Sequence, residues 1–262
     1  MNSVSSLAYV HPEAKLGENV IVEPFAFVDS NTEIGDGTRV MTHATILAGA
    51  RIGKNCTIFP QAVVAGIPQD LKFKGEETEA IIGDNTTIRE CATVNRGTAS
   101  KGFTKVGSNC LIMAYSHIAH DCVLKDHIIL GNATQLAGEV EIDDYAVISG
   151  AVLVHQFCRI GRNVMIQGGS KIPKDIPPYI MVGREPIVFM GLNVVGLRRK
   201  GFTSDRINSI QEIYRYLYQS GLNVTQATER IEKELPESED RNHILDFIRS
   251  SNRGIVRGNM DV

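Results

Sequence analysis

Residues 106–172 read VGSNCL-IMAYSH-IAHDCV-LKDHII-LGNATQ-LAGEVE-IDDYAV-ISGAVL-VHQFCR-IGRNVM-IQGGSK-I when they are written in groups of six. Every group begins with an aliphatic residue, and the same spacing connects Val10 to Val64 and Ile82 to Val94. The chain thus carries 25 aliphatic anchors in three blocks. A hexapeptide repeat is a signature of a parallel β-helix. We expect each six-residue segment to form one side of a triangular coil with its anchor pointing inward, so that three segments complete a coil of 18 residues.

The position four places after the anchor is mostly small or β-branched, as at Ala26. Four of the five cysteines, Cys56, Cys110, Cys122 and Cys158, occupy this position. The cysteines form no CxxC pair and their number is odd, so neither a zinc site nor a disulfide framework is indicated. We therefore expect these thiols to be buried as small apolar groups.

Two breaks in the repeat predict loops that leave the coil at about residues 66–80 and 97–105. Extended loops on a rigid scaffold often carry binding groups. The fold is predicted to be mainly β, with a parallel β-helix over residues 1–190 and a C-terminal α-helical domain over residues 191–262.

The helical domain is indicated by a change of period after Pro177-Pro178. Ile207, Ile210 and Ile213 have helical spacing, and Thr203 or Ser204 can cap the N-terminus of this helix. Further helices are expected after Asn223 and near Ser238.

Composition excludes several classes of protein. A net charge of −3 over 262 residues gives no general attraction to nucleic acid. Residues 1–6 lack the basic and apolar stretches of a signal peptide, and no segment has the roughly 18 consecutive apolar residues of a membrane span. We expect a cytoplasmic, soluble chain without stable membrane insertion.

His120, Gly138 and Gln156 are spaced 18 residues apart, each two places after an anchor. Residues at this spacing share a position in successive coils, so the His120 imidazole is expected to face a position without a side chain. A histidine can act as a general base near neutral pH, and a free glycine amide can stabilise an oxyanion. The pattern predicts a site for acyl transfer.

A simpler interpretation is that His120 is a solvated histidine on the surface of the coil. Two further histidines argue against this interpretation: His117 lies one turn corner away, and His155 reaches the same face two coils on. A second alternative is a zinc site between subunits, as in the γ-class carbonic anhydrases, for which His117, His120 and His155 would have to converge.

Several longer motifs occur together: Gln69-Asp70-Leu71-Lys72, Arg96-Gly97-Thr98, His117-Ile118-Ala119-His120-Asp121-Cys122, His155-Gln156-Phe157-Cys158, Asp175-Ile176-Pro177-Pro178-Tyr179, Gly191-Leu192-Asn193 and Gly196-Leu197-Arg198-Arg199-Lys200-Gly201-Phe202. With these motifs, the chain resembles the UDP-N-acetylglucosamine O-acyltransferase family over essentially its whole length. The resemblance implies a left-handed β-helix, although general crossover rules favour the opposite hand.

The resemblance implies transfer of an (R)-3-hydroxyacyl chain from acyl carrier protein to the 3-OH of UDP-N-acetylglucosamine, the first step of lipid A biosynthesis. It implies a homotrimer with the active site between neighbouring subunits, and no metal or bound cofactor. The donor is a phosphopantetheine thioester carried by the acidic acyl carrier protein, for which residues 198–200 offer a basic surface. N-acylation of a 3-amino UDP-sugar stays open, as do, less favoured, a γ-carbonic anhydrase-like zinc hydrolyase and a non-catalytic binder of acyl carrier protein.

Roles for individual residues follow from the same resemblance. His120 would be the general base, Asp121 would orient it, and the Gly138 amide would bind the oxyanion. The residues expected to bind the substrates are Gln69, Asp70, Lys72, His117, His155, Gln156, Asn193, Arg199 and Lys200. Three positions depart from the family pattern, namely Asn95, Glu139 and Val195.

Acyl length is expected to depend on Met165 and Gly168, which the resemblance identifies with a hydrocarbon ruler. A glycine at position 168 leaves the groove open for terminal methylenes, and each buried methylene contributes roughly 0.8 kcal/mol. We therefore expect a long donor, on the order of 14 carbons or more. Alternatively, Gly168 serves only close packing within the coil.

Overall fold

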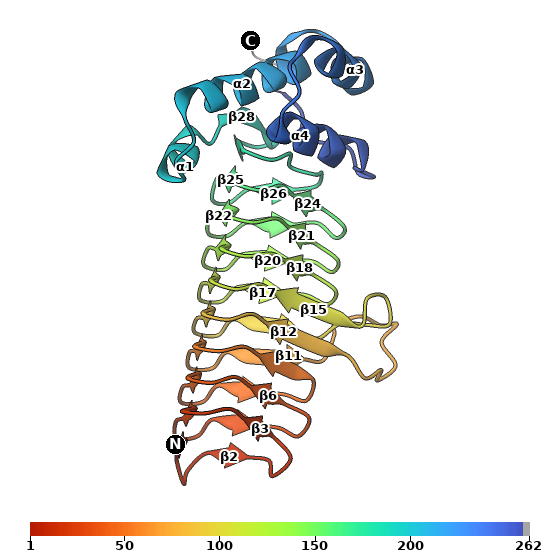
Figure 1. The fold of residues 1–262 in the computed structure, drawn as a ribbon. Coiled ribbons are helices and arrows are strands. Elements are labelled where there is room, and N and C mark those ends of the chain that lie inside the picture. The colour runs from red at the N-terminus through yellow and green to blue at the C-terminus, as the bar shows by residue number, and fades with distance from the viewer. Residues whose placement is uncertain (259–262) are drawn as a thin grey trace.

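The computed structural model describes residues 1–258 and consists of a long coil of short strands with helices at its C-terminal end (Figure 1). The first sheet contains β1 (Ser3–Val4), β4 (Ile21–Val22), β7 (Arg39–Val40), β10 (Thr57–Ile58), β13 (Thr87–Ile88), β16 (Leu111–Ile112), β19 (Ile129–Leu130), β22 (Val147–Ile148), β25 (Met165–Ile166), β27 (Ile180–Gly183) and β28 (Val188–Leu192). The second contains β2 (Tyr9–Val10), β5 (Phe27–Val28), β8 (Thr45–Ile46), β11 (Val63–Gly66), β14 (Thr93–Asn95), β17 (His117–Ile118), β20 (Gln135–Leu136), β23 (Leu153–Val154) and β26 (Lys171–Ile172). The third contains β3 (Lys15–Leu16), β6 (Glu33–Ile34), β9 (Ala50–Ile52), β12 (Glu79–Ile82), β15 (Phe103–Val106), β18 (Val123–Leu124), β21 (Glu141–Ile142) and β24 (Arg159–Ile160).

The chain passes from the first sheet to the second and then to the third within each coil, so the predicted repeat is confirmed. From β1 to β26, strands not separated by an inserted loop pair in parallel with partners 18 residues apart, such as Ile118 and Leu136. Beyond them, β25 pairs in parallel with β27, and β27 pairs with β28 in antiparallel fashion. All 25 anchors are buried except Val10 and Leu16 near the N-terminal end, which are half-buried. The aliphatic anchors thus form one continuous core along the coil.

The outer faces of the three sheets differ in charge. On the third sheet the outward residues include Lys15, Glu33, Arg51, Glu141 and Arg159, several of them in ion pairs. The outward positions of the first and second sheets are mostly apolar or neutral, and Ile21, Ile129, Tyr9 and Leu153 are among the exposed large apolar side chains. Two faces of the coil are therefore suited to packing and one to solvent.

The predicted loops are present between β11 and β12 (residues 67–78) and between β14 and β15 (residues 96–102). Both project from the same side of the coil, at right in Figure 1. Strand β12 resumes the third sheet by pairing with β9 and β15, so the loops interrupt the sequence repeat without interrupting the stack.

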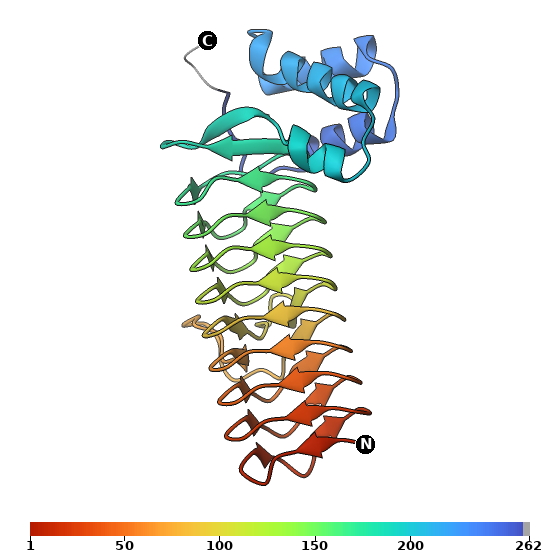
Figure 2. The same ribbon diagram turned by 90° about the vertical axis from the view of Figure 1, so that its left-hand side faces the viewer.

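The C-terminal helices are α1 (Val194–Arg199), α2 (Ser204–Gln219), α3 (Val224–Glu234) and α4 (Glu239–Arg249). Thr203, Asn223 and Ser238 cap α2, α3 and α4 with their side chains. Of the two candidates for the first cap, Thr203 is the one used, and the helices expected after Asn223 and near Ser238 are present. The helices cover only the C-terminal end of the coil (Figure 2). The expected domain boundary at residues 190/191 falls within β28, and residues 259–262 of the expected domain lie outside the described residues. No helix within residues 1–258 is long and apolar enough to cross a membrane.

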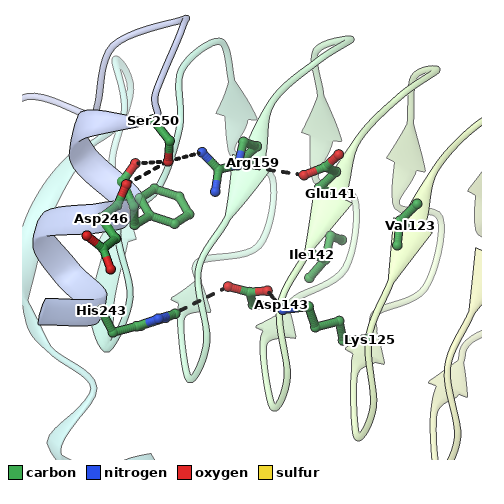
Figure 3. A pocket seen from close by; sticks show the side chains of 10 residues that line it. Val123, Lys125, Glu141, Ile142, Asp143, Arg159, His243, Asp246 and Ser250 are labelled. Carbon is green, nitrogen blue, oxygen red and sulfur yellow. Dashed lines mark hydrogen bonds and ion pairs between the residues drawn. The ribbon is translucent and has the colours of Figure 1, made fainter. Parts of the chain in front are cut away.

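Helix α4 packs against the third sheet around a polar pocket of about 260 Å³ (Figure 3). Arg159 donates to the Ser250 hydroxyl at 2.9 Å, and its guanidinium lies 4.6 Å from the centre of the Phe247 ring. On the opposite side of the pocket, the His243 Nε2 is 3.9 Å from the Asp143 carboxylate. These contacts join the helical domain to the coil.

Candidate active site

His120 and Asp121 lie at the turn where the chain leaves the second sheet for the third. Asp121 has a positive φ of 60°, in keeping with the residues three places after the anchor in other coils. This tight turn brings the Asp121 carboxylate against the neighbouring imidazole, with Oδ2 2.7 Å from His120 Nδ1. The carboxylate can only accept, so Nδ1 carries the proton and Nε2 is left with a free lone pair. His120 is thus arranged to accept a proton at Nε2.

Asp121 is fully buried, and burial by itself raises a carboxyl pKa. Hydrogen bonds from Thr98 and His120 outweigh burial and hold the pKa of Asp121 below its ordinary value. The carboxylate therefore stays ionised at neutral pH, where it stabilises an imidazolium on His120.

Gly138 lies directly against the His120 ring, one coil further along. A Cβ at this position would be 2.6 Å from both Cε1 and Nε2 of His120, closer than van der Waals contact allows. The expected stacking of His120 and Gly138 is confirmed, and any side chain at position 138 would clash with the imidazole in this position. Within residues 1–258 the Gly138 N–H donates to no backbone acceptor, which leaves it free for a ligand.

The first inserted loop places Asp70 near the base, with its Oδ2 3.9 Å from His120 Nε2. The amide of Lys72 donates to the Asp70 carboxylate at 2.9 Å, which orients this side chain. Gln69 and Lys72 are exposed on the same loop. The motif around Asp70 therefore adjoins the dyad although it is far from it in sequence.

His117 projects outward from β17 and its Nδ1 is 2.7 Å from the Thr93 hydroxyl. Burial, with a smaller contribution from the nearby His120, lowers the pKa of His117. Gln156 lies one coil beyond Gly138 on the same edge, and the exposed His155 contacts the Gln156 carbonyl at 3.0 Å. These residues line the edge that carries His120.

Other expected site residues lie elsewhere on the same chain. Asn193 caps α1 and donates to the Asn163 carbonyl at 2.9 Å, at the turn from the third sheet to the first. Lys200 lies over the Tyr145 ring, 3.0 Å from its centre, at the same edge, and Arg199 is exposed beside it. Partial burial lowers the pKa of Lys200. Within one copy of the chain, His120 lies at the edge between the second and third sheets, whereas Asn193 and Lys200 lie at the edge between the third and first sheets.

The residues expected to set acyl length lie on the first sheet and at its edge with the second sheet. Met165 is on the outer face of the first sheet, and Gly168 is exposed at the turn from the first sheet to the second. A Cβ on Gly168 would be 3.2 Å from the Gly150 carbonyl oxygen, a close but not prohibitive contact. Within a single copy, Gly168 and His120 lie at opposite ends of the second-sheet face.

The three departures from the family pattern have different surroundings. Glu139 accepts a hydrogen bond from the Ser100 hydroxyl at 2.9 Å. Asn95 donates to the Ile67 carbonyl and fastens the first loop, while its own Oδ1 is buried without a partner. Val195 is 63% exposed on α1.

The sequence did not assign a role to Thr98 or Lys101, although both contact the dyad. Arg96-Gly97-Thr98 stood out as a motif, but no spacing rule could show that its loop folds onto Asp121. No group of three or more His, Cys, Asp or Glu side chains in residues 1–258 is placed to hold a metal ion.

Comparisons with known proteins agree with this architecture. Residues 31–66 match the bacterial transferase hexapeptide family, and residues 175–256 match the second domain of UDP-N-acetylglucosamine O-acyltransferase. Acyl-[acyl-carrier-protein]--UDP-N-acetylglucosamine O-acyltransferases from Thermodesulfovibrio yellowstonii and Halorhodospira halophila are 41% and 43% identical, over 98% of this chain and their full length.

Solved structures are equally similar. The UDP-N-acetylglucosamine acyltransferase of Bacteroides fragilis is 56% identical with a TM-score of 0.96, covering 97% of this chain and 100% of that one. The Arabidopsis enzyme is 33% identical with a TM-score of 0.87, covering 97% and 100%. Fold and relatives together define a hexapeptide-repeat acyltransferase built on a left-handed β-helix, which confirms the expected handedness. The chain belongs to the UDP-N-acetylglucosamine O-acyltransferase family.

Proposed function

We propose that the chain transfers an (R)-3-hydroxyacyl group from acyl carrier protein to the 3-OH of UDP-N-acetylglucosamine, the step that opens lipid A biosynthesis. The observation that carries this proposal is the buried pair of Asp121 and His120 facing a free glycine amide. Two relatives of the chain, 41% and 43% identical to it, are named for this reaction, which supports the assignment of both substrates.

The chemistry follows from the site. His120 Nε2 removes the proton of the sugar 3-OH while the hydroxyl oxygen attacks the thioester carbonyl carbon. The Gly138 N–H donates to the oxyanion of the tetrahedral intermediate. The carbon–sulfur bond then breaks, and the His120 imidazolium returns its proton to the departing phosphopantetheine sulfur. Asp121 stabilises the imidazolium throughout.

We propose that the active form is a homotrimer in which each site is shared by two copies. A ring requires two unlike contact faces on each copy, and the weakly charged first and second sheets provide them. If the second sheet of one copy packs on the first sheet of the next, the edge with His120 meets the partner's edge that carries Asn193 and Lys200. The split of the site over two edges of one chain is then explained.

The same packing suggests a path for the acyl chain. Between the two faces, the outward side chains of Leu153, Ile129 and Met165 form an apolar lining that leads toward the edge with Gly168. Met165 and Gly168 are proposed to limit acyl length from this lining.

Gln69, Asp70, Lys72, His117 and Gln156 are proposed to hold the sugar nucleotide, with His155 near the acyl chain. Arg198 and Arg199 are exposed at the end of α1, and a basic surface there suits the acidic acyl carrier protein. We place the reaction in the cytoplasm, because all five cysteines are free thiols, as expected in a reducing compartment.

The proposal is tested by mass spectrometry of the products formed from UDP-N-acetylglucosamine and a panel of hydroxyacyl carrier proteins. An O-linked product is cleaved by mild alkali, whereas the amide from a 3-amino UDP-sugar survives, so the bond type is decided in the same assay. A folded His120→Ala variant should lose at least ~100-fold in kcat. Acylation of the 3-amino sugar alone, or near-normal turnover without His120, would refute the proposal.

A further inference from the structure

The second inserted loop surrounds the carboxylate of Asp121. The Thr98 N–H donates to Oδ1 at 3.0 Å, the Lys101 N–H donates to the same oxygen at 3.2 Å, and the Thr98 hydroxyl donates to Oδ2 at 2.6 Å. His120 Nδ1 is the second donor to Oδ2. A carboxylate offers about four lone-pair sites, and here all of them are used. Rotation of the carboxylate would therefore break hydrogen bonds in a buried place.

The direction of the Thr98 hydroxyl proton is fixed by its surroundings. Thr98 Oγ1 accepts from the Ser100 N–H at 3.2 Å, so one lone pair is occupied. The Asp121 carboxylate can only accept, and the hydroxyl proton must therefore point to Oδ2. Thr98 is 8% exposed and Asp121 fully buried, so the bonds between them are shielded from water.

The loop itself is fastened to the coil that carries Gly138. The Ser100 hydroxyl donates to Glu139 at 2.9 Å, and the Lys101 ammonium lies 3.1 Å from Glu141. Glu139, one of the departures from the family pattern, thus stabilises the loop. Two consecutive loop residues are held by side chains beyond the dyad, so Thr98 is anchored independently of His120.

We propose that Thr98 is a positioning residue of the dyad: its amide and hydroxyl fix the Asp121 carboxylate, which keeps the proton on His120 Nδ1 and presents Nε2 to the acceptor hydroxyl. This inference rests on the proposed function. Thr98 exchanges no proton in the reaction. The proton of the sugar hydroxyl goes to His120 Nε2, and Asp121 remains ionised.

The test is Thr98→Val, which removes the hydroxyl and keeps the branched shape. We expect kcat to fall by ~10- to 100-fold, the scale of a misplaced catalytic group, while KM for both substrates changes little. Thr98→Ser, which keeps the hydroxyl, should restore most of the rate. In an Asp121→Ala background, Thr98→Val should lower kcat by less than about twofold, because Thr98 acts only through Asp121.

Thr86→Val is the matched control for loss of a buried threonine hydroxyl. Thr86 is fully buried, donates to the Gly107 carbonyl at 2.8 Å and accepts from the Cys110 N–H at 3.1 Å. Neither of these partners belongs to the network around Asp121. It should lower Tm without lowering kcat. The inference is overturned if Thr98→Val keeps its kcat, or if its loss of kcat is undiminished in the Asp121→Ala background.

A readout without turnover separates this inference from the proposed function. In ¹⁵N NMR of histidine-labelled protein, His120 should be protonated at Nδ1 in the wild type and should gain the Nε2-protonated tautomer in Thr98→Val. An unchanged His120 tautomer in the variant would overturn the inference even if the enzyme is active. The predicted tautomer change would support it even if the wild type failed to acylate UDP-N-acetylglucosamine.

Discussion

At the scale of single residues, Gly138 shows that the position of the proposed base depends on the absence of a neighbouring side chain. A Cβ on Gly138 would be 2.6 Å from Cε1 and Nε2 of His120, so even a methyl group would displace the imidazole. We expect Gly138→Ala to reduce kcat by ~100-fold or more, because the base moves and the amide is screened. Circular dichroism and Tm should show a folded protein. Substantial activity in this variant would mean that His120 can tolerate displacement or that another group acts as the base.

Gly168 offers a second test at this scale, because two roles for it make different predictions. If it limits acyl length, Gly168→Met should move the optimum to shorter donors while the best donor is still used well, since each lost methylene contact removes roughly 0.8 kcal/mol. Gly168→Ala adds only the Cβ that approaches Gly150 and controls for backbone strain. Competition between donors of different length in one assay, read by mass spectrometry, measures the preference. If alanine and methionine give the same loss without a change of preference, Gly168 serves packing alone.

At the scale of elements, the joint between α4 and the third sheet contains a histidine that is sensitive to pH. Burial, followed by the nearby positive charge of Arg162, lowers the pKa of His243, and Asp143 only partly opposes this. The unfolded chain therefore binds the proton more readily, and stability should decrease as pH falls below the ordinary histidine value of about 6.5. Tm measured between pH 7.5 and 5.5 should fall.

His243→Gln should flatten part of this dependence on pH. The variant removes the titratable imidazole and its 3.9 Å approach to Asp143, but no hydrogen bond of His243 Nε2 is lost among the described residues. His117 also has a lowered pKa and contributes in the same direction, so some dependence should persist. If the wild type and His243→Gln lose stability in parallel, the joint does not titrate.

The sequence predicted those elements that follow a repeating or capping rule. The hexapeptide period located the coil, both loops and the turn of His120. Helical spacing with a cap at Thr203 or Ser204 located α2, and helices were also expected after Asn223 and near Ser238, where α3 and α4 begin. The hairpin of β27 and β28 was missed because it pairs through backbone contacts that leave no period of their own. The short α1 begins with two valines, which have modest helical propensity, and was missed as well. The contacts of Thr98 with Asp121 join residues 23 positions apart across a loop, so no local pattern encodes them.

At the scale of the whole molecule, the proposed sharing of each site between two copies predicts complementation between different variants. His120→Ala and Asn193→Ala should each be impaired as homotrimers. When the two are unfolded together and reassembled, random mixing should restore about a quarter of the sites, because one interface can combine an intact His120 with a partner's intact Asn193. Activity of the mixture, compared with that of each variant treated alike, measures this recovery. No recovery in mixed trimers of confirmed composition would place the complete site within one chain.

The pairing of residues 18 apart also sets which changes of length the molecule can accept. Inserting one full coil of 18 residues would act as a translation: everything beyond it would move along the axis by about 4.8 Å and keep its face. Inserting a single six-residue segment would act as a rotation by one side of the triangle and carry the His120 edge to a different face. The regular part of the β-helix can therefore gain or lose residues only in whole coils, whereas other added residues must leave it as loops, as residues 67–78 and 96–102 do. Deleting one coil of 18 residues between His120 and Gly168 would shorten the distance along the axis between these two residues by about 4.8 Å, and with it the space for the acyl chain.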